Sequence, residues 1–175
     1  LLQSSLAPIV MPTLARLVFA GVLLVYFLKS AQTKLGDSWL VPDFGAYTQI
    51  LPRVFEAVSY DPSQIGVIGR ATVLFGTYTE ILFPILILIG LFTRFAALGM
   101  IGFVFVQSYV DIVGHGIDAA TRGSWFDAVS NSAILDQRAF WVLTFLILVA
   151  RGAGPLSLDA LLVKLRGGSA VESAA

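Results

Sequence analysis

One apolar stretch, residues 71–93, constrains the fold of this chain more than any other feature. Its 23 residues lie between Arg70 and Arg94, and a helix of that length crosses a hydrocarbon core about 30 Å thick. The stretch nevertheless carries a carboxyl group, Glu80, near its middle. Pro84 follows four residues later and has no N–H to donate to the carbonyl oxygen of residue 80. A carboxyl group beside a freed carbonyl oxygen is costly inside a membrane helix, and such positions tend to be functional.

The composition is that of an integral membrane protein. Hydrophobic residues make up 57% of the 175 residues and charged residues 13%, whereas soluble domains are typically about 45–50% apolar and about 25% charged. The formal net charge of zero gives no indication of a nucleic-acid partner. The absence of cysteine and the single histidine exclude disulfides, thiolate-bound iron–sulfur clusters and a haem held between two histidines of the chain. Electrons that pass through this chain therefore need a bound organic carrier or a partner subunit.

The hydropathy pattern predicts an all-α integral membrane four-helix bundle, a single domain over residues 1–175. The spans are expected at about residues 14–31, 70–92, 95–113 and 134–150. Thr93 and Arg94 form the whole predicted connection between the second and third spans. These two helices should therefore form a tight antiparallel hairpin.

Short interfacial amphipathic helices are expected in the connections. In residues 32–69, apolar side chains recur at steps of three and four. This periodicity predicts one or two short helices, broken near Pro52, on the membrane surface or on top of the bundle. A stripe of leucines predicts a further interfacial helix over about residues 157–166.

The two ends of the chain are expected to be irregular and to lie on the same side of the membrane. Pro8 and Pro12 favour an interfacial lead-in over a long N-terminal helix. Residues 168–175 are small and polar enough to be disordered. Four spans place both termini beside the turn at residues 93–94, and basic residues in the short segments of that side favour cytoplasmic termini.

Glu80 is the first candidate for a functional residue. Burial in a low-dielectric environment favours the neutral carboxylic acid unless a cation reaches it. The side chain could donate to a quinone carbonyl or relay a proton. Alternatively, it could lock helices together by pairing with Gln107, Tyr78 or an arginine that snorkels inward. Gln107 lies as far after the predicted turn as Glu80 lies before it, so the two should share one depth.

Two polar residues and three arginines are weaker candidates. Asp111 and His115 are one helical turn apart and could bind a metal or move protons at the mouth of a quinone site. Two ligands are too few for a metal site, so a polar helix end in water is the favoured interpretation. Arg16, Arg94 and Arg138 are interpreted as interfacial anchors rather than substrate ligands.

Aromatic residues in the spans offer surfaces for a ring-shaped ligand. Tyr78, Tyr109 and Trp141 could stack on a quinone ring, although aromatic residues in spans more often pack in the core or lie in interfacial belts. The sequence has no pattern of a nucleophile with its base, no phosphate-binding loop and no broken repeat typical of a transporter. No metal site is predicted.

Three groups of residues carry a family resemblance. They are Arg16 with Lys34 and Leu35; Glu80 with Pro84, residues 88–94, Ala96 and Ala97; and Arg138 with Trp141 and residues 152–159. At these positions the chain resembles the DoxX family of small four-span bacterial membrane proteins. The resemblance covers most of residues 14–162.

The resemblance implies a redox setting in the bacterial inner membrane, because the related DoxD belongs to a thiosulfate:quinone oxidoreductase. The leading hypothesis is therefore a membrane subunit of a quinone-linked oxidoreductase system, in contact with membrane lipids and with other subunits of a complex. No intrinsic cofactor is expected, and a bound quinone is the candidate ligand. Glu80 is the candidate proton donor or relay, and the candidate quinone or lipid contacts are Glu80, Tyr78, Gln107 and Tyr109. The alternative is a non-catalytic structural or assembly subunit, and a small transporter is least favoured because one buried charge makes a poor pathway.

Overall fold

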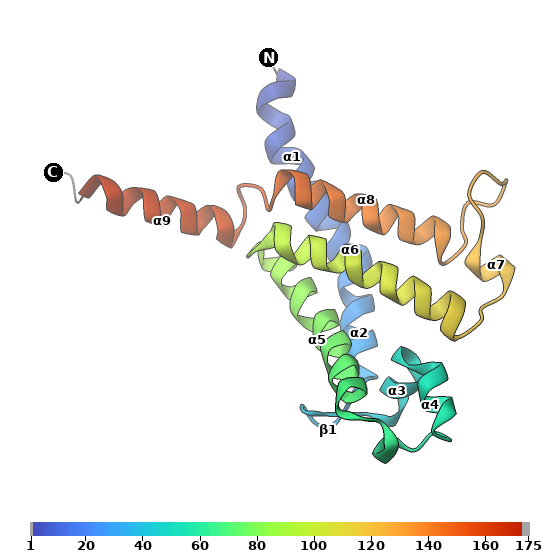
Figure 1. Ribbon diagram of the computed structural model, residues 1–175. Coiled ribbons are helices and arrows are strands. Elements are labelled where there is room, and N and C mark those ends of the chain that lie inside the picture. The colour runs from blue at the N-terminus through green and yellow to red at the C-terminus, as the bar shows by residue number, and fades with distance from the viewer. Residues whose placement is uncertain (1, 173–175) are drawn as a thin grey trace.

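The computed structural model describes the backbone of residues 2–172 and the side chains of residues 8–165. Within that range, four long helical segments make up the body of the molecule (Figure 1). They are the continuous run of α1 (Leu2–Phe19), the π-helical turn η1 (Ala20–Leu24) and α2 (Val25–Gln32); α5 (Val67–Ile89); α6 (Thr93–Tyr109), which continues into the π-helical turn η3 (Val110–Gly114); and α8 (Leu135–Arg151).

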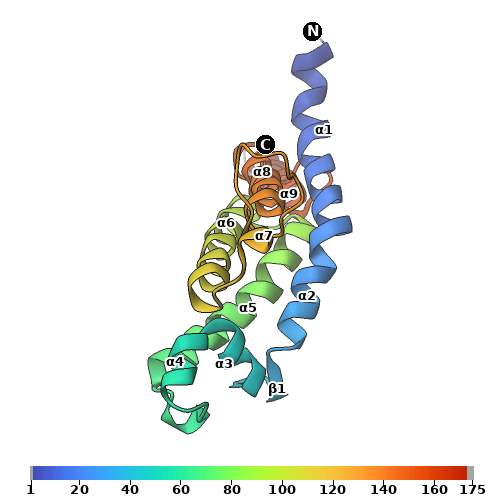
Figure 2. The ribbon, with the colours of Figure 1, turned by 90° about the vertical axis from the view of Figure 1, so that its right-hand side faces the viewer.

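The four segments close into a bundle because each packs mainly on two neighbours. α1 contacts α8, α2 contacts α5, α5 contacts α6, and α6 contacts α8 (Figure 2). The shared core holds fully buried large side chains, namely Phe19, Phe27, Ile87, Met100, Phe145 and Leu148. The structure confirms the predicted all-α membrane bundle.

The outer faces of the bundle are suited to lipid. Among the described residues, three helices are long and apolar enough to cross a membrane, namely Pro8–Gln32, Val67–Ile89 and Thr93–Gly114. Their outward side chains include Leu17, Phe75 and Phe105, each more than half exposed. Exposed apolar surface on this scale marks contact with a membrane or with other proteins. α8 is shorter, at 17 residues, which corresponds to about 25 Å at 1.5 Å per residue.

The N-terminal segment differs from its prediction. Residues 8 and 12 were expected to prevent a long helix, yet α1 runs through both prolines. Pro12 is fully buried, and a Cβ atom on Gly154 would lie only 3.1 Å from its Cγ, so the proline ring packs closely on the segment after α8. Burial of the ring offsets the missing hydrogen bond. The free energy of this burial depends on a tertiary contact, so the sequence pattern alone does not predict it.

Arg16 ties the end of the bundle where α5 passes into α6. Its guanidinium donates to the carbonyl oxygens of Ile87 at 3.0 Å and Leu88 at 2.5 Å, in the last turn of α5. It also donates to the carbonyl oxygens of Ala153 at 3.1 Å and Leu156 at 2.5 Å, after α8. One side chain thus donates to two carbonyl groups in the last turn of α5, where backbone acceptors lack a full set of helical partners, and to two in the segment after α8.

Asp159 stabilises the α5–α6 turn through three hydrogen bonds. Its carboxylate accepts the N–H groups of Phe92 at 2.9 Å and Thr93 at 3.1 Å, and its own N–H donates to the carbonyl oxygen of Gly90 at 2.9 Å. Gly90 has φ of +71°, and a Cβ atom there would lie 2.5 Å from the Cβ of Ser157, so no larger residue fits. The turn occupies residues 90–92 instead of the predicted 93–94, because α5 ends at Ile89 and α6 already begins at Thr93.

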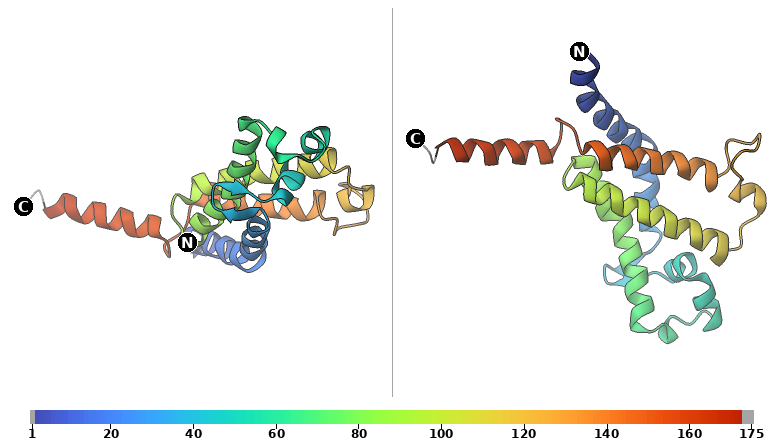
Figure 3. Two further views of the ribbon diagram at one scale, coloured as in Figure 1. Left: turned by 90° about the horizontal axis from the view of Figure 1, so that it is seen from below. Right: turned by 45° about the horizontal axis from the view of Figure 1, so that its top comes forward.

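The long connection after α2 folds into a cap on the first turns of α5 (Figure 3). It contains a two-stranded antiparallel sheet, β1 (Leu35–Ser38) and β2 (Val41–Pro42), followed by α3 (Phe44–Ile50), α4 (Pro52–Ala57) and the 3₁₀ turn η2 (Pro62–Gln64). The two short helices break at Pro52 as predicted. A second core cluster joins the cap to α5 through Tyr47, Phe55 and Val73. The β-hairpin was not predicted, because its two short strands show no regular apolar alternation.

Two further helices lie outside the bundle. α7 (Ala119–Arg122) is a short turn in the connection before α8. α9 (Leu158–Glu172) extends away from the bundle (Figure 1) and is longer than the helix predicted over residues 157–166. The prediction of disorder is wrong for residues 168–172, which are helical, and residues 173–175 lie outside the described part of the chain.

Candidate functional site: a cavity between α5 and α6

α5 and α6 diverge from their common turn (Figure 1), and a cavity of about 680 Å³ lies between them at the far end from that turn. Its walls are completed by residues of α2, α3, η3 and α8. One part of the lining is apolar and aromatic, and another part is charged. The cavity is therefore amphipathic, and the residues of its polar part determine what it can bind.

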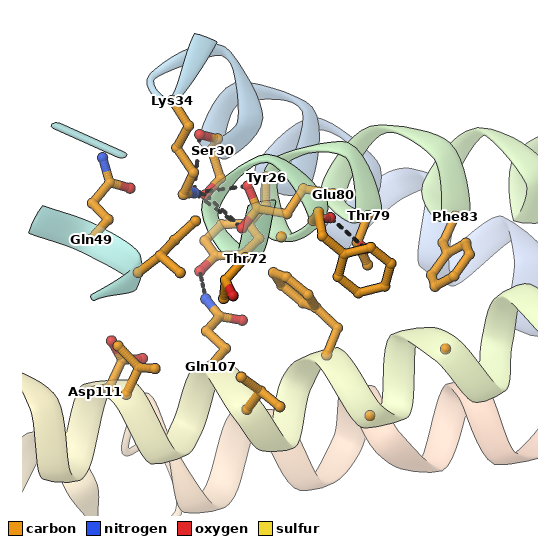
Figure 4. A pocket seen from close by; sticks show the side chains of 18 of the residues that line it. Tyr26, Ser30, Lys34, Gln49, Thr72, Thr79, Glu80, Phe83, Gln107 and Asp111 are labelled. Carbon is orange, nitrogen blue, oxygen red and sulfur yellow. Dashed lines mark hydrogen bonds and ion pairs between the residues drawn. The ribbon is translucent and has the colours of Figure 1, made fainter. Parts of the chain in front are cut away.

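The polar part centres on a buried ion pair between Lys34 and Glu80 (Figure 4). Lys34 Nζ lies 2.8 Å from Glu80 Oε2 and 3.1 Å from Oε1. Ser30 Oγ donates to Glu80 Oε1 at 3.3 Å, and Lys34 Nζ donates to Ser30 Oγ at 2.6 Å and to its carbonyl oxygen at 3.2 Å. Lys34 is 4% exposed and Glu80 is 2% exposed. Each charge compensates the other where water does not reach.

The local fold explains why Lys34 reaches Glu80. Tyr26 and Ser30 lie one helical turn apart on the same face of α2, and Lys34 follows on that face just after the helix ends. The backbone of Lys34 is fixed by the bond from its N–H to the Ala31 carbonyl at 3.0 Å and by the Asp43 N–H, which donates to its carbonyl at 3.0 Å. The first turn of the cap thus positions the lysine.

A second ion pair lies on the opposite wall. Arg138 Nη2 donates to Asp111 Oδ2 at 2.5 Å, and Arg138 Nη1 donates to Ser108 Oγ at 2.9 Å. Arg138 is 7% exposed and lies 5.8 Å from the ring centre of Trp141. The prediction of an interfacial anchor was wrong for Arg138, because the π-helical turn η3 brings a carboxylate to it inside the bundle.

Gln107 lies between the two ion pairs. Its Nε2 donates to the hydroxyl of Tyr26 at 2.9 Å, which links α6 to α2 (Figure 4). Gln107 and Glu80 share the cavity, in keeping with their predicted equal depth. Among the side chains that the structure describes, however, no hydrogen bond joins them, because α5 and α6 have already diverged at this depth and Glu80 bonds to Lys34 and Ser30 instead.

The apolar wall is shaped by small residues facing aromatic ones. Phe83 packs directly on Gly99, where a Cβ atom would lie 2.1 Å from the ring carbon Cε2. At Gly102, by contrast, no described atom lies within 4 Å of an added Cβ, so this position faces open space. Phe75 and Val106, which also line the cavity, are 73% and 61% exposed. The cavity therefore borders the outer, lipid-facing surface between α5 and α6.

Two of the predicted ligand contacts lie elsewhere. The Tyr78 hydroxyl donates to the carbonyl oxygen of Trp39 in the β-hairpin, and Tyr109 is 65% exposed on the outer face of α6. Neither lines the cavity, because each lies on a different helical face from Glu80 and Gln107. Trp141 packs in the core against Tyr26 and Phe27.

Asp111 and His115 do line the cavity, but the geometry is not that of a metal site. Asp111 pairs with Arg138, and His115 Nε2 lies 3.2 Å from the carbonyl oxygen of Gln49 at an exposed edge. Within the described residues, no group of three or more histidine, aspartate or glutamate side chains could hold a metal ion. Gln49 belongs to α3 of the cap, so its contact with His115 lies where the cap meets the cavity.

The sequence analysis does not predict Lys34 as the partner of Glu80. Lys34 lies beyond the predicted end of the first span, and charged residues there were counted as part of a polar connection. The signal that was available is the four-residue spacing of Tyr26, Ser30 and Lys34, which continues one polar face of the helix beyond its end.

The charges of the cavity balance. Lys34 with Glu80 and Arg138 with Asp111 are two internal ion pairs, so a ligand with a net charge would find no uncompensated partner among them. The cavity suits a neutral molecule with a polar head, an aromatic or aliphatic body, and access from the lipid side.

An apolar helical bundle with exposed apolar faces and a buried ion pair at a lateral cavity defines a polytopic helical membrane protein. A sequence model of the DoxX family matches residues 11–111, which is more than half of the chain, and the chain belongs to the DoxX family.

The matched region contains Arg16, Lys34, Glu80 and Gln107, and therefore most of the cavity. An uncharacterised protein from Haemophilus influenzae is 32% identical over 87 residues, which cover 50% of this chain. The match spans 50% of the length of that relative. No solved structure matches the chain.

Proposed function

We propose that this protein is a membrane subunit of a quinone-linked oxidoreductase system, and that the cavity beside Glu80 holds the quinone. In this proposal the chain is a multi-pass protein of the bacterial inner membrane with cytoplasmic termini. It contacts membrane lipids and other subunits of the complex, one of which supplies the electrons.

The observation that carries the proposal is a lipid-bordering cavity that ends at a buried carboxylate. Its volume of about 680 Å³ lies within the range of about 300–1,000 Å³ that is typical of small-molecule sites. Phe75, Phe83 and Phe103 offer aromatic surfaces for a ring. Glu80 and Lys34 offer a carboxylate and an ammonium group, which can exchange a proton or polarise a carbonyl. The balanced charges favour a quinone over an anionic phospholipid, whose net charge would be uncompensated.

One observation favours the alternative, a structural or assembly subunit without a ligand. Both carboxylate oxygens of Glu80 already accept hydrogen bonds from Lys34. Because the pair is satisfied internally, holding the end of the first helix against α5 is a sufficient role for it, and no ligand is needed. The two functions differ in what they require of the empty part of the cavity, because only the quinone function needs that space.

Gly102 provides the test, because it lines the cavity and a Cβ atom added there meets open space. The protein is purified in mild detergent, and bound quinone is extracted and quantified. We expect quinone to accompany the wild-type protein and Gly21→Leu, whose added side chain also meets open space but lies outside the cavity. We expect Gly102→Leu to lose it. The absence of quinone from all three proteins, or its retention in Gly102→Leu, would favour the structural function.

A second experiment addresses Glu80. In membranes that contain the whole complex, we expect Glu80→Gln to lower quinone-coupled turnover while the subunits still assemble. Unchanged turnover would remove Glu80 from the proton path, and failed assembly would assign it a structural role.

A further inference from the structure

The hydrogen-bonding groups of the cavity differ in how far they are already engaged. Four donors in its wall are committed to the protein. Lys34 Nζ and Ser30 Oγ both donate to Glu80, while Thr72 Oγ1 donates to the Ile68 carbonyl at 2.9 Å and Thr79 Oγ1 to the Phe75 carbonyl at 2.8 Å. A ligand therefore meets few free donors in this part of the wall.

Two buried polar atoms on the other wall have no partner. Among the described residues, Gln107 Oε1 and Arg138 Nε are buried and make no hydrogen bond, although both side chains line the cavity. Buried polar groups are nearly always paired, so each such atom in a native structure calls for an explanation. A ligand in the cavity would supply one.

The two atoms belong to one polar cluster. Arg138 Nη1 donates to the hydroxyl of Ser108, the residue after Gln107, so the guanidinium lies beside the same turn of α6. Gln107 Nε2 donates to the Tyr26 hydroxyl, and this bond turns Oε1 away from Tyr26. Of the buried polar atoms without a partner, the cluster therefore offers one acceptor, the amide oxygen of Gln107, and one donor, the Nε–H of Arg138.

This inference rests on the proposed function, in which the cavity holds a quinone. An unpaired acceptor and an unpaired donor in the wall distinguish the oxidised quinone from the reduced quinol. A quinone carbonyl only accepts hydrogen bonds, so it can engage Arg138 Nε–H but leaves Gln107 Oε1 unpaired. A quinol hydroxyl both donates and accepts, so it can engage either atom. We propose that the cavity binds the reduced quinol in preference to the quinone, and that Gln107 is the residue that makes the distinction.

The test compares the affinities of both redox forms. Purified protein in nanodiscs is titrated without oxygen with decylubiquinol and, separately, with decylubiquinone, and binding is measured by calorimetry. We expect the quinol to bind about tenfold more tightly, the effect of one hydrogen bond to a buried acceptor. In Gln107→Met, which removes the acceptor at similar size, the ratio of the two affinities should fall to about one.

Gln137→Met is the matched control, because Gln137 is an exposed glutamine of α8 that does not line this cavity. It should keep the wild-type preference. Melting temperatures of all variants show that they are folded. Equal affinities for both forms in the wild type, tighter binding of the quinone, or an unchanged ratio in Gln107→Met would overturn the selectivity and leave the quinone function standing. Failure of the wild type to bind either form would overturn both.

Discussion

Lys34 donates to both carboxylate oxygens of Glu80, at 2.8 and 3.1 Å, across 46 residues of sequence. The pair joins the end of the first helix to the middle of α5 at the polar part of the cavity. It gives a carboxylate in an apolar bundle a compensating charge, and it explains why an acidic residue is tolerated in the most apolar stretch of the chain.

The first prediction concerns the energetic coupling of this pair. Lys34→Met leaves the carboxylate unpaired, and Glu80→Gln leaves the ammonium group unpaired, so each should lower the free energy of unfolding by about 3–5 kcal/mol. The double variant Lys34→Met/Glu80→Met removes both charges and should be much closer to the wild type. Unfolding in detergent, followed by circular dichroism, measures the three values. Additive losses would show that the two charges are not coupled.

The second prediction concerns Arg16. Removing its guanidinium takes away the hydrogen bonds to four carbonyl groups, two at the end of α5 and two after α8, so Arg16→Met should lower the free energy of unfolding by about 3 kcal/mol. Arg16→Lys should recover only part of this, because one ammonium group cannot reach all four oxygens. Arg94→Met is the control at the same end of the bundle, where an exposed arginine is replaced and the change should stay within about 0.5 kcal/mol. An equal effect at both positions would contradict the role assigned to Arg16.

The bundle was predictable from sequence because its signal is local. The run around Glu80 and the apolar period of the neighbouring helices depend on residues close to each other in the chain. The same is true of the break at Pro52, which separates α3 from α4 as expected. Long helices in a membrane are fixed mainly by length and composition, so tertiary contacts change them little.

The site was only partly predictable because its contacts are not local. Glu80 and Gln107 were placed in one region by their equal distances from the turn, but the partners of Glu80 are Lys34 and Ser30, and the partner of Gln107 is Tyr26. The spacing of residues 26, 30 and 34 indicates a polar helical face, but the periodicity of one segment does not show which distant segment that face contacts. The same reason explains Pro12, whose burial against Gly154 allows a helix where local rules predict a break.

The third prediction separates two glycines of α6 that look alike in sequence. Gly99→Ala places a methyl group 2.1 Å from the ring of Phe83 and should cost about 1–3 kcal/mol through overpacking. Gly102→Ala meets open space and should be neutral or stabilising, since alanine is the better helix former by about 1 kcal/mol. Melting temperatures of the two variants provide the measurement. A cost at Gly102 equal to that at Gly99 would mean that the cavity is closed at this position.

The fourth prediction concerns topology. The sequence has no cysteine, so single cysteines can report accessibility without a background signal. With cytoplasmic termini, a maleimide that does not cross membranes should label Ser124→Cys in intact spheroplasts. It should label Leu156→Cys only after the membrane is permeabilised. The reverse pattern would place the termini outside.

Photolabelling with an azidoquinone in native membranes, followed by peptide mapping, tests the quinone site most directly. Label should appear on residues 72–83 of α5 and on residues 99–115, which comprise most of α6, η3 and the following His115. It should be displaced by unlabelled quinone, and it should disappear in Gly102→Leu but not in Gly21→Leu. Label that is confined to other lipid-facing segments, or that persists in Gly102→Leu, would contradict a quinone site in this cavity.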